Sequence, residues 1–205
     1  MQKRKSRVIM NPKYRGLAVL DIDGVLADFE EGFCEAFGYS NRDLYSLEER
    51  YPDADQGLLK EFVENPLNYK DLAPIFGGVL LLNQLYSRGY YILLMTSRRK
   101  ELKTVTLDWL KKYNIPFQEL YFSCNKPEGI NDFLALHGNL ELQIFVDDSV
   151  STLRAVERGA ADRVPFLAWG QPWNEGYYPR LRYNESAFKV EANVGDGTWK
   201  WIWEK

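Results

Sequence analysis

Short apolar runs alternate along the chain with segments of helical periodicity. The apolar runs cover residues 17–21, 90–96, 120–122, 143–146 and 163–167, and each is short enough for a strand. Helices are predicted between them at 79–87, 102–113, 130–136 and 150–158. Gly89 and Gly159 follow two of these segments, where glycine commonly ends a helix. This alternation predicts an α/β fold with a central parallel sheet and crossover helices.

The segment between the first two apolar runs is longer than a single crossover requires. It contains two predicted helices, 29–37 and 56–64, with a loop over 38–55. Its aromatic residues are Phe29, Phe33, Phe37, Tyr39, Tyr45, Tyr51, Phe62 and Tyr69. We interpret residues 29–74 as a small helical cap inserted after the first strand, and we expect most of these rings to form its own core.

The pattern changes after Trp169. Gln171-Pro172-Trp173-Asn174 has a loop composition, and residues 176–187 show no clear period. Residues 188–194 alternate, Gly195-Asp196-Gly197 is a turn, and 198–203 places Trp199, Trp201 and Trp203 on one strand face. A C-terminal β-hairpin is predicted, with the tryptophans packed on the body or, alternatively, contacting a ligand or partner subunit.

The expected organisation of the whole chain is an arm (1–15), a core (16–28 and 75–170), the cap (29–74) and an extension packed on the core (171–205).

The composition excludes several kinds of catalytic and metal-binding site. The length of 205 residues suits one domain with a small insertion, and 45% hydrophobic with 27% charged residues is ordinary for a globular protein. The single histidine, His137, excludes a multi-histidine metal site and argues against a Ser-His-Asp triad. Cys34 and Cys124 are too few for a disulfide framework or a cysteine-rich zinc site. Any catalysis must therefore rest on carboxylates, hydroxyls and lysine.

The net charge of -3 conceals an uneven distribution. Residues 1–15 carry six basic residues and no acid, which leaves 20 basic against 29 acidic residues in the remainder. No apolar segment of signal-peptide type follows this basic start, and no apolar run approaches the length of a membrane span. We expect a cytoplasmic protein whose basic arm is a solvated tail. The acidic body argues against a broad nucleic-acid groove.

Polar residues follow the predicted strands where each one ends. These segments are Asp21-Ile22-Asp23-Gly24, Thr96-Ser97, Ser123-Cys124-Asn125-Lys126 and Asp147-Asp148-Ser149. Ligands of parallel sheets bind outside the carboxyl ends of the strands. Clustered carboxylates repel one another unless a cation lies among them, and Mg²⁺ is the usual cation beside phosphate. Each segment alone also fits a turn, a helix cap or a solvated lysine; their joint occurrence predicts a site.

The two aspartates of the first segment allow a division of labour. Asp21 can attack phosphorus to form an aspartyl-phosphate, and Asp23 can protonate the leaving oxygen and then activate water. The hydroxyl of Thr96 or Ser97 and the ammonium of Lys126 can hold the phosphoryl oxygens.

The order Asp-x-Asp-Gly-Val, Thr/Ser, Lys, Asp-Asp resembles the motifs of the haloacid dehalogenase-like superfamily of phosphohydrolases over about residues 17–170. Within it, residues 21–33 resemble the opening of the 5′(3′)-deoxyribonucleotidases. The resemblance implies a Rossmann-like three-layer sandwich with a small C1-type cap. It also implies that Asp21, Asp23 (through its carbonyl) and Asp148 bind Mg²⁺, with Asp147 in support.

The same resemblance implies that Phe29 lies against a nucleobase, with Tyr69 a weaker candidate for that pocket. The Arg98-Arg99-Lys100 cluster departs from the family; Arg98 either meets a second phosphate of the substrate or lies on the surface at a helix start.

The leading hypothesis is therefore a Mg²⁺-dependent phosphatase of (deoxy)nucleoside monophosphates. An acid at position 23 distinguishes the chain from haloacid dehalogenases and phosphonatases. The alternatives are a polynucleotide 3′-phosphatase that grips the backbone through residues 1–15 and Arg98-Arg99, another small-molecule phosphatase, and a non-catalytic phospho-ligand module. The expected partner is a small nucleotide substrate, and neither a nucleic acid nor a membrane is expected as a partner. Formation of a homodimer is left open.

Overall fold

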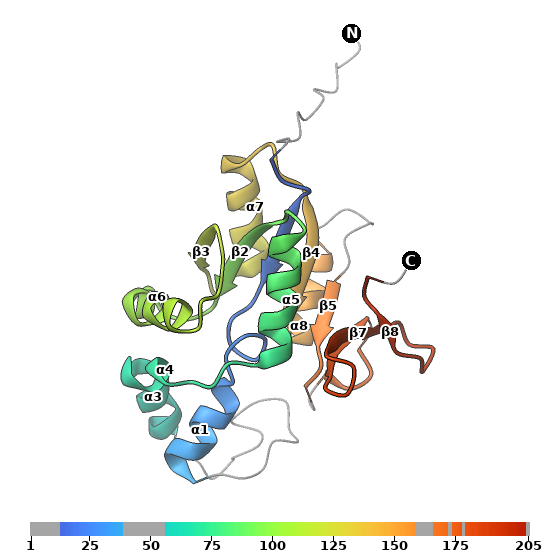
Figure 1. Ribbon diagram of the computed structural model, residues 1–205. Helices are drawn as coiled ribbons and strands as arrows, with labels where there is room; N and C mark the ends of the chain where they lie inside the picture. Colours follow the sequence, from blue (N-terminus) through green and yellow to red (C-terminus); the bar gives the residue numbers. More distant parts are fainter. Residues whose placement is uncertain (1–12, 39–55, 159–165, 172–173, 178, 204–205) are drawn as a thin grey trace.

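The computed structural model describes residues 13–38, 56–158, 166–171, 174–177 and 179–203. Within them one sheet has the strand order β3-β2-β1-β4-β5-β6-β7-β8 (Figure 1). Its strands are β1 (Leu17–Leu20), β2 (Tyr91–Thr96), β3 (Glu119–Phe122), β4 (Leu142–Asp147), β5 (Phe166–Trp169), β6 (Arg180–Asn184), β7 (Lys189–Asn193) and β8 (Lys200–Trp201). The neighbours from β3 to β6 pair in parallel and the last two pairings are antiparallel. The predicted α/β fold with a central parallel sheet is confirmed.

Helices cover both faces of this sheet. Ala18 and Leu20 of β1 pack in one apolar cluster with side chains of α5 (Phe76–Ser87) and α6 (Lys103–Lys112), which follows the short helix η1 (Lys100–Leu102). Leu17 and Val19 pack in a second cluster with α7 (Lys126–Leu136) and α8 (Val150–Glu157). A strand buried on both faces needs a continuous apolar sequence, which explains why β1 reads Leu-Ala-Val-Leu. Each fully buried aliphatic side chain contributes about 1.5–3 kcal/mol.

The segment interpreted from the sequence as a cap contains α1 (Phe29–Phe37), α3 (Gln56–Glu64) and α4 (Leu67–Lys70), which lie between β1 and α5 in the chain (Figure 1). Asp28 caps α1 by accepting a hydrogen bond from the Glu31 amide, and Gly38 ends the helix with a φ of 72°. Phe33, Cys34 and Phe62 form a separate apolar cluster inside the cap. The predicted loop, with Tyr39, Tyr45 and Tyr51, lies beyond Gly38 outside the described residues.

The C-terminal segment continues the sheet. The β6 strand pairs in parallel with β5, and β7 and β8 form the predicted hairpin. The strand β6 was not predicted, since only Leu181 of its residues is fully buried. Trp203 packs on α5: its indole Nε1 donates to Gln84, and the Arg88 guanidinium lies 4.1 Å from its ring. Trp199 packs on Arg182, whereas Trp201 is exposed.

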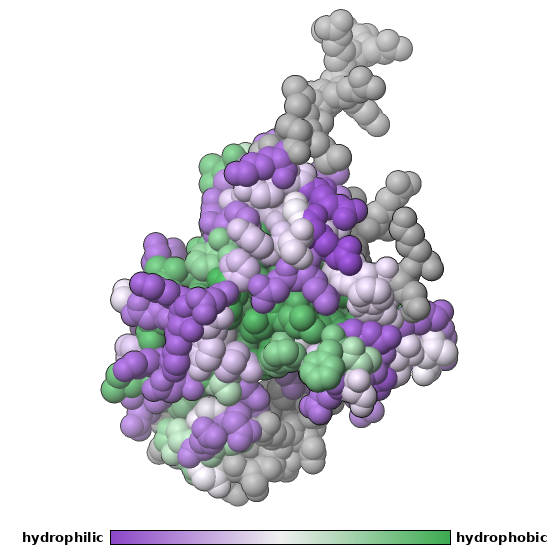
Figure 2. All heavy atoms as spheres, viewed as in Figure 1, coloured by the Kyte–Doolittle hydropathy of each residue, from purple (hydrophilic) through white to green (hydrophobic). Residues whose placement is uncertain are grey.

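One end of α5 borders a surface cleft. The cleft has a volume of about 720 Å³ and lies between α5 and the C-terminal strands, with Phe76, Trp169, Tyr183 and Phe188 in its lining. Apolar side chains gather over this part of the molecule in Figure 2.

Some element boundaries differ from the prediction. The helix α7 begins at Lys126 rather than at 130, because Asn125 caps it by accepting from the Glu128 amide and Pro127 fits its first turn. The strand β5 begins at Phe166, and the preceding part of the predicted run, 163–165, lies outside the described residues. Searched over the described residues, the structure contains no helix that is both long and apolar enough to cross a membrane.

Candidate functional site

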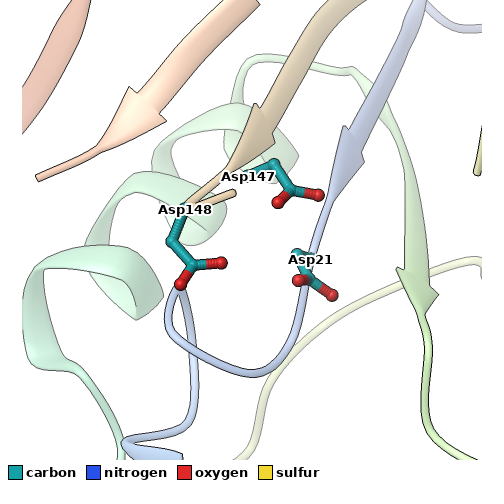
Figure 3. A group of neighbouring side chains, drawn as sticks. All are labelled: Asp21, Asp147 and Asp148. Atoms are coloured by element: carbon teal, nitrogen blue, oxygen red, sulfur yellow. The ribbon is translucent and has the colours of Figure 1, made fainter. Parts of the chain in front are cut away.

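Three carboxylates meet where β1 and β4 end. The two strands are neighbours with Leu20 opposite Val146, so their carboxyl ends coincide. Asp21 follows β1 and its amide donates to the Val146 carbonyl at 3.0 Å, while Asp147 ends β4 and Asp148 follows it. One oxygen of each carboxylate lies within 4.8 Å of the others, and the side chains converge in Figure 3. The structure therefore brings together three of the four acids predicted at the strand ends, namely Asp21, Asp147 and Asp148.

Lys126 connects two of these acids. Its Nζ lies 2.8 Å from Asp21 Oδ2 and 2.7 Å from Asp147 Oδ2, and the side chain is 4% exposed. The start of α7 at Lys126 places the ammonium there. The other oxygen of Asp147 accepts from the Ser149 amide at 2.9 Å. Asp147 is thus engaged at both oxygens, which suits a residue that supports Lys126.

Asp148 lies against the turn that follows β1. Gly24 in this turn has a φ of 76°, and a Cβ built on it would collide with the Asp148 carboxylate. Glycine is required here for both reasons. The turn and Asp148 are in close contact only because position 24 has no side chain.

Burial dominates the electrostatics of the cluster. It raises the pKa of Asp21 to about 7; Lys126 counteracts this, and Asp147 and Asp23 add to it. Burial, followed by the charges of Asp147 and Asp21, raises the pKa of Asp148 well above its usual range. Burial opposes the charge of Lys126, but Asp147 and Asp21 outweigh it and raise the pKa of the ammonium. Several carboxylates share the one ammonium of Lys126, so the cluster keeps an excess of acidic groups over basic ones. Its possible ligand atoms are all oxygens, which fits a hard divalent cation such as Mg²⁺.

Asp23 lies apart from this cluster in a pair with Arg98. Arg98 Nε donates to Asp23 Oδ2 at 2.8 Å and Nη2 donates to Oδ1 at 2.6 Å. The arginine side chain is 1% exposed and that of Asp23 is 26% exposed. The surface position considered for Arg98 from the sequence is therefore wrong, because the structure buries its guanidinium against Asp23.

The two hydroxyls after β2 have different surroundings. Thr96 is fully buried, and its Oγ1 accepts from the Arg98 amide at 3.2 Å. Ser97 is exposed, and its Oγ makes only a 3.5 Å contact to the Ser123 carbonyl. Ser97 is the more accessible of the two to an anionic ligand.

The aromatic residues expected to face a nucleobase lie in the cap. Phe29 is half-buried, with its ring centre 5.1 Å from that of Phe62 and 5.9 Å from that of Tyr69. Tyr69 is 3% exposed and its hydroxyl donates to the Val63 carbonyl at 3.1 Å. Phe29 is partly exposed, whereas Tyr69 is engaged within the protein.

The loop after β5 contributes residues that sequence reasoning did not assign to the site. Asn174 is 1% exposed, and its Nδ2 donates to the carbonyls of Asp148 at 2.9 Å and Trp169 at 2.6 Å. The Gln171 Nε2 donates to the Gly24 carbonyl at 2.9 Å. These amides fasten the segments that carry Asp148 and Gly24. Their sequence signal was two amides in a proline-containing loop directly after a strand.

Curated relatives match part of the chain, whereas no family model matches it. Proteins of Bordetella pertussis and Bordetella bronchiseptica, both provisionally named 5′(3′)-deoxyribonucleotidase, are 26% and 24% identical to it over 110 residues. Each alignment covers 47% of this chain and 59% of the relative. The chain therefore spans less than two thirds of the length of these relatives.

Solved structures resemble this chain over most of its length. A haloacid dehalogenase-like family hydrolase from Streptococcus pneumoniae has a TM-score of 0.54 at 18% identity, covering 78% of this chain and 87% of that one. A dehalogenase with an intermediate complex has a TM-score of 0.55 at 12% identity, covering 83% of this chain and 92% of that one. At these identities the likeness concerns the fold, and the chain has the haloacid dehalogenase-like fold.

Proposed function

From this fold and the cluster at its strand ends, we propose that the chain is a Mg²⁺-dependent phosphatase of (deoxy)nucleoside monophosphates that works through an aspartyl-phosphate. The observation that carries the proposal is the convergence of Asp21, Asp147 and Asp148 with Lys126 at 2.8 Å from Asp21. Such a group offers a nucleophile, a fixed positive charge and oxygen ligands in one place.

The first half-reaction transfers the phosphoryl group to the protein. An oxygen of Asp21 attacks phosphorus, the bond to the leaving nucleoside oxygen breaks, and Asp23 gives that oxygen a proton. Lys126 touches Asp21 and can bind the developing charge on the phosphoryl oxygens. Ser97, exposed beside the site, can donate to the same oxygens.

The second half-reaction releases phosphate. Water attacks phosphorus, the bond between phosphorus and the Asp21 oxygen breaks, and Asp23 takes the proton from the attacking water. Asp21 is thereby restored as a carboxylate. Because Asp23 gives one proton and takes one back, the cycle leaves the protein unchanged.

Residues that fit a cation are Asp21, Asp148 and the carbonyl of Asp23, with Asp147 in support. When bound, Mg²⁺ would offset the negative charge that the substrate phosphate adds to this acidic cluster. Asp147 is fully buried and bonded to Lys126 and the Ser149 amide, so we assign it to holding the lysine.

Two findings support a nucleoside monophosphate as the substrate. The curated relatives carry a deoxyribonucleotidase name, and Phe29 presents a partly accessible ring in the cap. The polynucleotide alternative gains no support from the arginines: Arg98 is buried against Asp23, and Arg99 Nη1 lies 2.7 Å from Glu64.

The proposal is tested by a phosphate-release screen over ribo- and deoxyribonucleoside 5′- and 3′-monophosphates, with sugar phosphates and p-nitrophenyl phosphate included. We expect turnover of nucleotides with Mg²⁺, none with EDTA, and none in Asp21→Asn. Asp132→Asn is the matched control, because Asp132 is exposed on α7. Turnover of sugar phosphates without any nucleotide would overturn the substrate assignment, and no Mg²⁺-dependent turnover at all would overturn the enzyme assignment.

A further inference from the structure

The pair formed by Asp23 and Arg98 joins elements that are far apart in the sequence. Asp23 follows β1 and Arg98 follows β2, which pair side by side in the sheet. The remaining guanidinium nitrogen, Nη1, donates to Thr106 Oγ1 on α6 at 3.1 Å. The Tyr69 ring on α4 of the cap lies 4.6 Å from Arg98 Cζ. Two core loops, a core helix and the cap thus meet at one guanidinium.

The two partners differ in their freedom to move. Arg98 is fixed by its bonds to Asp23 and Thr106, by its own amide bonded to Thr96, and by the ring of Tyr69. Its side chain is 1% exposed against 26% for Asp23. A planar guanidinium that donates to both oxygens of a carboxylate fixes its position and its plane. The buried arginine is therefore the fixed part, and it sets where the more exposed carboxylate lies.

We propose that Arg98 is a positioning residue: it holds the Asp23 carboxylate for proton transfer, and Tyr69 makes that position depend on the cap. This inference rests on the proposed function, since it assigns Arg98 a role through Asp23. It differs from the expectation that Arg98 binds a substrate phosphate, because its donors are already directed at Asp23 and Thr106.

Arg98→Lys (R98K) is the informative change, because lysine keeps the charge but cannot donate to both oxygens of Asp23 and to Thr106 together. We expect kcat for a nucleoside monophosphate, whose leaving oxygen needs a proton, to fall about tenfold or more, with KM altered less than about twofold since the substrate loses no contact. Lys112→Gln is the control: Lys112 on α6 also connects core and cap, through Asp71 at 2.8 Å, but is 47% exposed. It should leave kcat unchanged.

A double-mutant cycle with Asp23→Asn separates positioning from a general structural role. If Arg98 acts through Asp23, R98K in the Asp23→Asn background should change kcat less than about twofold. Losses that multiply, or a raised KM in R98K, would overturn the inference and indicate direct contact with the substrate. If the wild type turns over substrate and the losses of the two variants multiply, only the inference about Arg98 is refuted. If the wild type turns over no substrate, the proposed function is refuted.

A second variant covers the case in which R98K does not fold or Asp23→Asn has no measurable rate. Thr106→Val removes only the third bond of the guanidinium with little change in shape, and we expect kcat to fall about threefold with KM unchanged. Wild-type kcat in Thr106→Val, with folding verified by circular dichroism, would then count against the proposal.

Discussion

Lys126 is the residue on which the charge balance of the cluster depends most. It contacts Asp21 and Asp147, both of which are almost fully buried, and its own side chain is 4% exposed. Removing one member of a buried ion pair leaves the other charge without compensation, which costs far more than losing an exposed pair. Lys126 therefore supports the folded state as well as the proposed chemistry.

We predict that Lys126→Met lowers the free energy of unfolding by about 3 kcal/mol, measured by urea denaturation in EDTA. Lys112→Met should lower it by less than about 1 kcal/mol, since its pair with Asp71 is exposed. Equal losses in the two variants would show that the buried carboxylates do not need the lysine.

The meeting of Asp21, Lys126, Asp147 and Asp148 was predictable because strand order and strand ends determine it. The pairing of Arg98 was not predictable, since a residue just past a strand can direct its side chain to solvent, to the ligand or inward. The positions of Asp23, of Thr106 on α6 and of Tyr69 on the cap decide the direction. No sequence pattern shows that these three residues meet Arg98.

Among the elements, the turn between β1 and α1 combines two demands on glycine. Gly24 has a φ of 76° and close contact with Asp148, whereas Gly38 at the end of α1 has a φ of 72° and open space around it. Both glycines have a left-handed backbone conformation, but only Gly24 has a carboxylate next to it.

This difference gives a matched test. Gly38→Ala should lower the free energy of unfolding by about 1–2 kcal/mol through left-handed backbone strain. Gly24→Ala should lower it by more, because its Cβ also collides with the Asp148 carboxylate. Only Gly24→Ala should also weaken Mg²⁺ binding, seen as a smaller rise in melting temperature when Mg²⁺ is titrated in. If both variants respond to Mg²⁺ like the wild type, Asp148 is not a ligand.

Prediction of elements succeeded where a period was present and failed where it was absent. Leu17–Leu20 and Tyr91–Thr96 are buried strands with continuous apolar sequence, and both were predicted. Arg180–Asn184 mixes charged and polar residues, and its pairing with β5 and β7 makes it a strand, so tertiary context decided the outcome.

For the whole molecule, the C-terminal strands widen the sheet beyond β5 and are fastened to α5. Trp203 bonds to Gln84 and lies under Arg88, while Trp201 on the same hairpin is exposed. The attachment of the segment to the core therefore depends on one tryptophan far more than on the other.

Trp203→Ala should lower the free energy of unfolding by about 2 kcal/mol, since a half-buried indole, its hydrogen bond and its cation contact are lost together. Trp201→Ala should change it by less than about 0.5 kcal/mol. Urea denaturation of the two variants beside the wild type measures the difference, and a larger loss for Trp201→Ala would place the anchor elsewhere.

The position of β1 between two other strands affects the order in which the sheet forms during synthesis. Its neighbours are β2 and β4, so one edge of this fully buried strand stays unpaired until residues 142–147 have left the ribosome. Asp148 is synthesised later still, as is Asn174, whose side chain donates to the Asp148 carbonyl. Pairings this distant in sequence form slowly. The nascent chain therefore carries an aggregation-prone apolar strand until β4 has been synthesised, and the acidic cluster of Asp21, Asp147 and Asp148 is completed only after that.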